Sequence, residues 1–518
     1  MPQERTQLEL ESTVSLKRAK LLDKLSQHVF NNLPAHLICI KDMKLLSRTD
    51  LWETLRADIQ SLPSADILAL QVCTIFWFPK SYHETWIVTT LFFFFQEDVQ
   101  SRVKYAIFSH RWGAHEPSYQ QLSQGPTPIN SPGLMKLLRY CDKAHVHGCA
   151  YAWSDTCCIN KSSSAELEEA IRAMYRWYRD AEVCIVHLAE TGSFEDFKDE
   201  PWFRRGWTLQ ELLAPKRVMF YNRNWDSLSV GNVHPAESRN DKEDWRILGA
   251  ISGVTGIPVG DLRHFRPGCE RVSEKMRWAS RRETTRVEDV AYALIGIFDI
   301  TMSISYGEGQ WAFHRLMECI AQRCSEPGFF AWAGDASPYS LALPASPTSY
   351  GAPVLDAQSA ARLRLTGSVF EEVGDRSYSI TKLGVQVKLL LLPVHWIRRE
   401  DSSESYTLSF TEGNFLETNP RPTLSQAYYE IFKPEQCVLG VVDYARADED
   451  RGSLRVGERY FCLLLKRNGR SGYIKSRTDK VLVWHCVESI TKELEDVCLL
   501  NTLSSYDRNI ASTCPLPQ

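Results

Sequence analysis

The sequence predicts an α/β fold with a largely parallel sheet, followed by a helical extension and a β-rich C-terminal domain. Between Lys104 and Asn222, short apolar runs alternate with longer amphipathic segments, which is typical of a parallel sheet covered by helices. Residues 270–325 have a helical pattern, and after Phe329 strand-like runs separated by turns take over. We therefore expect four regions, with boundaries at 1–102, 103–230, 231–328 and 329–518.

Length and composition narrow the class of protein. The 518 residues exceed what one core usually serves, and 44% hydrophobic with 24% charged residues is typical of a globular chain. A net charge of −4 gives no general reason to bind nucleic acid or an anionic membrane, so neither is expected as a partner. The fifteen cysteines include no C-x-x-C pair and follow a charged N-terminus without a secretory signal. A reducing, cytoplasmic location and no metal centre are expected.

The N-terminal region contains one anomalous stretch. Residues 1–60 have the pattern of polar helices, with a short strand and turn in LPAHLICIKDMKLL. Residues 67–95 are strongly apolar, but Pro79, Lys80 and nearby polar residues divide the run into pieces too short to cross a bilayer. We expect no membrane partner and assign this stretch no function.

Four strands are expected between Lys104 and Asn222: KYAIFSH, AYAWSD, VCIVHLA and RVMFY. A helix between them should begin at a capping box formed by Ser163 and Glu166, and another should cover residues 201–213. Parallel sheets bind ligands beyond the carboxyl ends of their strands. The candidate ligand-binding residues therefore follow the strand ends, and they are Ser109, Arg111 and Trp112 after the first strand and Asp155 after the second.

Trp207 and Glu211 are four residues apart in the segment PWFRRGWTLQELLAP. On a helix they would share one face, so that an aromatic ring lies beside a carboxylate. If that face borders a cleft, the ring can stack on a flat ligand and the carboxylate can stabilise a developing cation or accept a proton. The alternative is structural: Trp207 is a core residue, and Glu211 pairs with Arg204 or Arg205.

Several blocks together resemble a known family. FSHRWG at 108–113, WSDTCCINK at 153–161, a helix ending in MYRWYRDAEV and then RGWTLQELLAP are similar, in this order, to the fungal heterokaryon incompatibility (HET) domain. Lys161 stands where many members have glutamine. The resemblance implies a TIR-like, flavodoxin-like fold and a role in self/non-self recognition and programmed cell death of fungal cells, a form of innate immunity.

The resemblance implies two modes of action. The first is assembly of the domain with itself or with another incompatibility protein, without a reaction. The alternative is NAD cleavage, because catalytic TIR domains break the nicotinamide glycosidic bond with a glutamate whose spacing from a tryptophan is kept in WTLQE. Glu211 is then the candidate catalytic residue, Trp207 a candidate ligand-binding residue, NAD a possible substrate, and no cofactor is implied. A carboxylate suits this chemistry, since loss of nicotinamide gives an oxocarbenium-like transition state.

Other motifs are weaker. Cys141, His145 and neighbouring cysteines lack the paired spacing of a zinc site. Cys158 with His145 or His187 as base is a further enzyme alternative. YGEGQWA, from Tyr306, resembles a dinucleotide-binding glycine motif but lacks the strand before it, so a turn that begins a helix is predicted instead.

Overall fold

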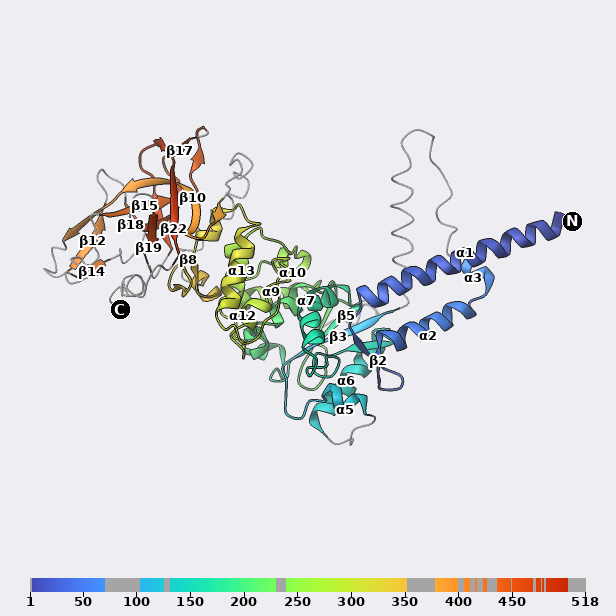
Figure 1. Cartoon of the computed structure of the whole chain (residues 1–518). Coiled ribbons are helices and arrows are strands. Elements are labelled where there is room, and N and C mark those ends of the chain that lie inside the picture. The colour runs from blue at the N-terminus through green and yellow to red at the C-terminus, as the bar shows by residue number, and fades with distance from the viewer. Residues whose placement is uncertain are drawn as a thin grey trace. The chain divides into compact units, whose positions relative to one another are not determined.

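The computed structural model describes residues 2–69, 103–124, 131–229, 239–351 and 378–398, and thereafter 405–409, 415–416, 423–425, 436–448, 450–468, 472–476, 478 and 481–501. The chain forms two compact units (Figure 1). The first comprises Met1–Phe203 with Gln210–Phe265, and the second comprises Arg204–Leu209 with Arg266–Gln518. Most of the apolar stretch 67–95, from residue 70 onward, lies outside the described residues. The four-region division stays a prediction.

The first unit is built on a six-stranded sheet whose four central members are the predicted strands. β3 (Tyr105–His110), β4 (Tyr151–Trp153), β5 (Val183–His187) and β6 (Val218–Tyr221) are parallel, in the spatial order β4-β3-β5-β6. Every residue of these strands is buried, as both faces of a covered parallel sheet require. The largely parallel α/β sheet is thus confirmed, and the strand order reverses at β3.

An N-terminal hairpin extends this sheet beyond β4. β1 (His36–Cys39) pairs antiparallel with β2 (Lys44–Ser47) and, through Ile38 and Cys39, with β4. The sequence predicted the strand and turn but not its place in the sheet. Helices α1 (Pro2–Asn31), α2 (Arg48–Ser61) and α3 (Ser64–Ala69) flank the hairpin, and α1 packs on α2 and α3 (Figure 1).

Helices cover the two faces of the parallel strands. Phe108 of β3 stacks on Tyr140 of α6 (Pro132–Val146), with ring centroids 4.2 Å apart. On the opposite face, Trp153 of β4 meets Trp177 of α7 (Ser164–Asp180) edge to face. A short helix α5 (Tyr119–Ser123) precedes α6.

The start of α7 agrees only in part with the predicted capping box. Ser163 accepts a hydrogen bond from the Glu166 N–H, as expected. The Glu166 carboxylate, however, accepts from the Asn160 N–H and contacts His36 of the N-terminal hairpin at 3.1 Å. Instead of capping the Ser163 N–H, the Glu166 side chain links α7 to β1.

The sequence predicts one helix over residues 201–213, but the structure interrupts it in the middle. A 3₁₀ turn η3 (Pro201–Arg204) and the helix α8 (Thr208–Leu213) are separated at Gly206. The Gly206 N–H donates to the Glu283 carbonyl at 2.8 Å, and the Glu283 N–H donates to the Arg204 carbonyl. These bonds to a remote segment replace the i to i−4 bonds of a continuous helix. η2 (Phe194–Asp199), α9 (Trp245–Thr255) and α10 (Val259–His264) complete the first unit.

The second unit begins with helices, as predicted. α11 (Val272–Ala279), α12 (Asp289–Tyr292) and α13 (Trp311–Ala321) are followed by η5 (Pro327–Phe330), the hairpin β7 (Ala336–Ser337) and β8 (Ser340–Pro344), and η6 (Pro347–Tyr350).

The glycine motif YGEGQWA is a turn that begins a helix. Gly307 and Gly309 have positive φ, and their N–H groups donate to the Glu288 carboxylate just before α13. This confirms the prediction made for the motif.

The C-terminal region is β-rich, as predicted, but its main sheet closes on itself. β10 (Gly384–Pro393), β15 (Cys437–Val441), β18 (Arg459–Asn468), β19 (Gly472–Lys475) and β22 (Glu495–Leu500) pair successively, and β22 returns to β10. The result is a small barrel rather than an open sheet or sandwich. Its other strands are β9 (Ser379–Ile380), β11 (His395–Arg398), β12 (Ser405–Ser409), β13 (Phe415–Leu416), β14 (Thr423–Ser425), β16 (Ala445–Arg446), β17 (Arg451–Leu454), β20 (Leu482–His485) and β21 (Ile490–Glu493).

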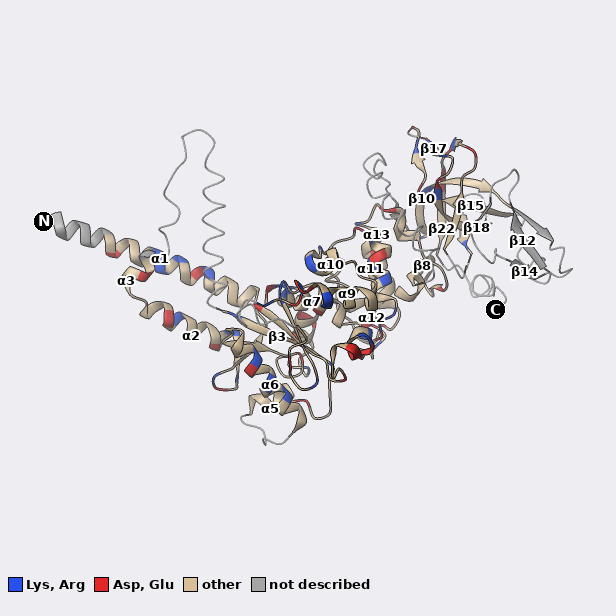
Figure 2. Ribbon diagram, turned by 180° about the vertical axis from the view of Figure 1, so that it is seen from behind, with Lys and Arg blue, Asp and Glu red and all other residues tan. Residues whose placement is uncertain are grey.

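Two further properties of the described residues bear on the predictions. Within these ranges, no helix has the length and apolar character needed to cross a bilayer. Lys and Arg residues alternate with Asp and Glu along the longer helices, such as α1 and α2 (Figure 2).

Candidate functional site

The candidate site lies at the carboxyl end of the parallel strands, where the chain reverses its order at β3. β3 and β5 are adjacent there, with Ser109 in register with Val186 and His110 in register with His187. Side chains alternate between faces along a strand, so Ser109 points to one face and His110 to the other. Crevices at such reversals are where α/β sheets bind ligands.

On one face, three buried side chains form a hydrogen-bonded chain. The Trp202 indole Nε1 donates to Ser109 Oγ at 2.8 Å, and the Ser109 hydroxyl donates to Glu211 Oε2 at 2.5 Å. Their exposed fractions are 0% for Trp202, 0% for Ser109 and 7% for Glu211. Leu209, at the start of α8, is fully buried and anchors the helix that carries Glu211. The Ser109 hydroxyl of β3 therefore fixes the direction of the carboxylate, and the Trp202 indole of η3 holds that hydroxyl in turn.

Trp207 lies apart from this chain. It precedes the first residue of α8 and hydrogen-bonds to Asp289 of the second unit, whereas Glu211 contacts Ser109 of the first. Burial raises the pKa of the Asp289 carboxyl, and the bond from Trp207 opposes this rise. Trp207 is thus bonded to Asp289, and Glu211 to Ser109.

Trp112 and Asp155 are brought together by the loops after β3 and β4. The Trp112 indole donates to Asp155 Oδ2 at 2.8 Å, and Lys161 Nζ lies 3.8 Å from the centroid of the same ring. Half of Trp112 is exposed. Burial lowers the pKa of Lys161, while Asp155 acts in the opposite direction. An exposed ring held at its edge and on one face can offer its other face to a planar group.

Arg111, the remaining candidate, forms an ion pair with Glu190 in the loop after β5. Its backbone carbonyl accepts a hydrogen bond from Lys136 Nζ at 3.1 Å. The pair joins the loops on either side of the strand reversal. An anionic ligand could reach this guanidinium only by competing with Glu190.

Of the two histidines on the other face of the strand ends, sequence reasoning did not single out His110 and named His187 only as a possible base for Cys158. His110 stacks on Phe108 at 4.0 Å between ring centroids, and His187 stacks on Trp225 at 4.3 Å. Burial, with a smaller effect of the Lys136 charge, lowers the pKa of His187 to about 4, so its imidazole is neutral at physiological pH. The signal was present, because both FSH and VCIVH end a buried strand with histidine.

The cysteine alternative gains no support from the electrostatics. Cys158 is buried, and burial holds the pKa of its thiol well above the ordinary value, so the thiolate that a nucleophile needs is disfavoured. In the part of the chain that the structure describes, no three His, Cys, Asp or Glu side chains are grouped to hold a metal ion.

The region just described is similar to a known protein family. Residues 105–196, from β3 into η2, match the profile of the heterokaryon incompatibility protein (HET) family. The chain carries a HET domain. The match includes Ser109, Arg111, Trp112 and Asp155 and ends before Glu211.

One relative extends the similarity. Vegetative incompatibility protein HET-E-1 of Podospora anserina is 42% identical over 233 residues, which is 42% of this chain and 16% of the relative. The chain therefore spans less than a fifth of that relative's length. No solved structure is significantly similar to this chain.

Proposed function

We propose that this chain is a cytoplasmic effector of fungal heterokaryon incompatibility, which causes regulated cell death when its HET domain assembles with itself or with another incompatibility protein. The observation that carries the proposal is the HET match at residues 105–196 together with the identity to a vegetative incompatibility protein. The strand order β4-β3-β5-β6 supports a TIR-like fold, because it has the 2-1-3-4 order of flavodoxin-like sheets.

In this proposal the HET domain occupies residues 103–230, with the helical extension 231–328 after it. The β-rich C-terminal domain, 329–518, senses the trigger or restrains the HET domain. Division of labour between units is a common arrangement in multidomain chains.

A second candidate function is NAD cleavage by Glu211. It is favoured by one observation: a buried carboxylate is held in a fixed direction by Ser109, at the strand end where such sheets bind ligands. Preorganised charge of this kind stabilises an oxocarbenium-like transition state. Trp112 and Asp155 are the supporting ring and ribose acceptor, since Trp207 is bonded to Asp289.

One experiment tests the effector role and separates the two modes. The full chain is expressed from an inducible promoter in a filamentous fungus, alone and with a fused dimeriser, and viability and cellular NAD are measured. The variant Glu211→Gln keeps the size of the side chain. Glu168→Gln, at a half-exposed position of α7 where the carboxylate pairs with Arg172, is its matched control. Killing that survives Glu211→Gln with unchanged NAD supports assembly, whereas joint loss of killing and of NAD depletion supports the enzyme.

The same proteins, purified and incubated with NAD, give a direct readout as free nicotinamide. Far-ultraviolet circular dichroism verifies that the variants remain folded. Unchanged viability of cells that express the wild-type chain, even when clustered, contradicts the effector role itself.

A further inference from the structure

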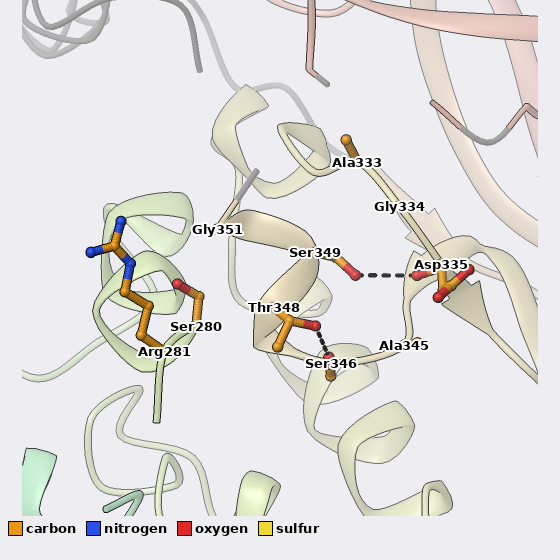
Figure 3. A pocket seen from close by; sticks show the side chains of 10 residues that line it. All are labelled: Ser280, Arg281, Ala333, Gly334, Asp335, Ala345, Ser346, Thr348, Ser349 and Gly351. Carbon is orange, nitrogen blue, oxygen red and sulfur yellow. Dashed lines mark hydrogen bonds between the residues drawn. The ribbon is translucent and has the colours of Figure 1, made fainter. Parts of the chain in front are cut away.

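The second unit contains a cavity of about 400 Å³ that is lined by residues of η5, β9, β10 and β22 and by the segment after β15. This volume suits a small molecule. A polar cavity of about 420 Å³ lies beside η6, but there the Arg281 side chain points away from Ser349 and Asp335, so its polar side chains do not converge on one ligand (Figure 3). The cavity at η5 has a different lining, which is apolar where it is buried and charged where it is exposed.

The buried part of this lining is apolar and aromatic. Its members are Pro327, Phe330, Val442 and Tyr444. The half-buried Tyr378 ring stacks on Phe329 with ring centroids 5.3 Å apart and meets Phe330 edge to face at 5.1 Å. Tyr444 is held in place by its hydroxyl, which donates to the Lys388 carbonyl at 3.1 Å. The aromatic wall is therefore formed by packing within the chain, and it offers edge and face contacts to the ring of a ligand.

The exposed part of the lining carries the charges. Lys388 and Asp496 lie opposite each other in the pairing of β10 with β22, and Lys388 Nζ is 3.5 Å from a carboxylate oxygen of Asp450. Arg446 is exposed, and among the residues that the structure describes none forms a hydrogen bond or ion pair with its guanidinium. Arg446 is therefore the cation of this lining that is available to an anionic ligand.

We infer that this cavity binds an aromatic carboxylate, with the ring against Phe330 and Tyr378 and the carboxylate on Arg446. A guanidinium binds a carboxylate through two parallel hydrogen bonds. Burial raises the pKa of Tyr378 well above its ordinary value, so its phenol is neutral and does not repel an anion. An uncharged aromatic ligand would leave the guanidinium unused, and an aliphatic acid would forgo the ring contacts. The inference goes beyond the role of the HET domain and does not depend on it.

Ligand-observed NMR titration of the full chain tests the inference, with 3-phenylpropionate, 3-phenylpropanol, propionate and octanoate as separate probes. We expect saturable binding of 3-phenylpropionate with a Kd of about 0.1–5 mM, the range of a small ligand with one charged group. The alcohol lacks the charge and propionate lacks the ring, so each should bind at least about fivefold more weakly. Octanoate, which keeps the carboxylate without a ring, should also bind more weakly.

Variants locate the binding. Arg446→Ala should weaken 3-phenylpropionate about fivefold or more and leave the alcohol unchanged, because the exposed arginine has no structural partner to lose. Arg451→Ala, at an exposed position of β17 outside the cavity, is its matched control and should change neither. Ser379→Trp places a large ring at an exposed position of the lining and should weaken both ligands, independently of charge.

Several results would overturn the inference. They are the absence of saturable binding of 3-phenylpropionate, equal or tighter binding of the alcohol or octanoate, equal effects of Arg446→Ala and Arg451→Ala, and unchanged binding to Ser379→Trp. None of these outcomes depends on cell killing or on NAD cleavage, so the inference can fail while the proposed function stands, and the reverse.

Discussion

Replacing Lys475 by methionine should stabilise the second unit. Lys475 ends β19, is 5% exposed, and has its Nζ 3.3 Å from the centroid of the Trp332 ring. Throughout the described part of the chain, no group accepts a hydrogen bond from this amine. Burial without an acceptor lowers the pKa of Lys475 from 10.5 to about 7.

The magnitude follows from that difference. The pKa of Lys475 falls from 10.5 to about 7, and each pKa unit corresponds to about 1.4 kcal/mol, so burying the charged amine costs roughly 5 kcal/mol of folding free energy at neutral pH. The cation–π contact with the Trp332 ring offsets about 2 kcal/mol of this cost. We expect Lys475→Met, which fills nearly the same volume without a charge, to raise the free energy of unfolding by about 3 kcal/mol.

The pH dependence has a definite sign. Between about pH 7 and 10.5 the unfolded chain binds the proton that folded Lys475 has lost, so wild-type stability falls as the pH is lowered through this window. Lys475→Met should lack this dependence, whereas Lys382→Met, at an exposed position, should keep it.

Amide hydrogen exchange of β18 and β19, measured at about pH 7 and about pH 9, gives the local free energy of opening for the three proteins. Equal pH dependence of Lys475→Met and wild type, or a loss of stability in the methionine variant at neutral pH, would refute the reasoning.

Three other predictions concern the first unit. Ser109→Ala removes the hydroxyl shared by a buried indole and a buried carboxylate, and should lower the free energy of urea unfolding by about 2–3 kcal/mol. An unchanged free energy would contradict the hydrogen bonds from Trp202 to Ser109 and from Ser109 to Glu211. Gly133→Ala would place a Cβ 2.2 Å from the His115 carbonyl oxygen, so the melting temperature should fall by an amount equivalent to about 2 kcal/mol or more, and an unaltered melting temperature would mean that the loop yields freely. Because the pKa of His187 is lowered to about 4, the unit should lose up to about 3 kcal/mol as the pH falls from 6.5 to 4; His187→Phe should flatten that decline, and parallel curves would count against it.

The parallel strands were predictable because each is a short buried run with its own turn residues. The N-terminal hairpin was not predicted as part of the sheet, since Ile38 pairs with Ala152, far along the chain. Local patterns carry no information about such a partner. The C-terminal strands were likewise visible in the sequence, but the pairing of β10 with β22, which lies far along the chain and helps to close the barrel, was not.

The candidate site was predictable residue by residue but not as an arrangement. Ser109 and Glu211 were both named from their positions, yet their bond depends on how α8 packs on the sheet. Helical spacing gave no sign that Trp207 bonds to Asp289, nor that Gly206 bonds to Glu283 just before α8 begins. Trp202 was assigned no role, although its indole completes the chain to Glu211.

The six residues from Arg204 to Leu209 have a practical consequence for anyone who trims this protein. They belong to the second unit, although the next segment of the chain, Gln210–Phe265, belongs to the first unit and contains Glu211. A fragment that stops at Phe265 would retain Ser109 and Glu211 but strip Gly206 and Thr208 of their bonds to Glu283 and Arg282. A lack of NAD cleavage by such a HET fragment would therefore not show that the intact chain is inactive.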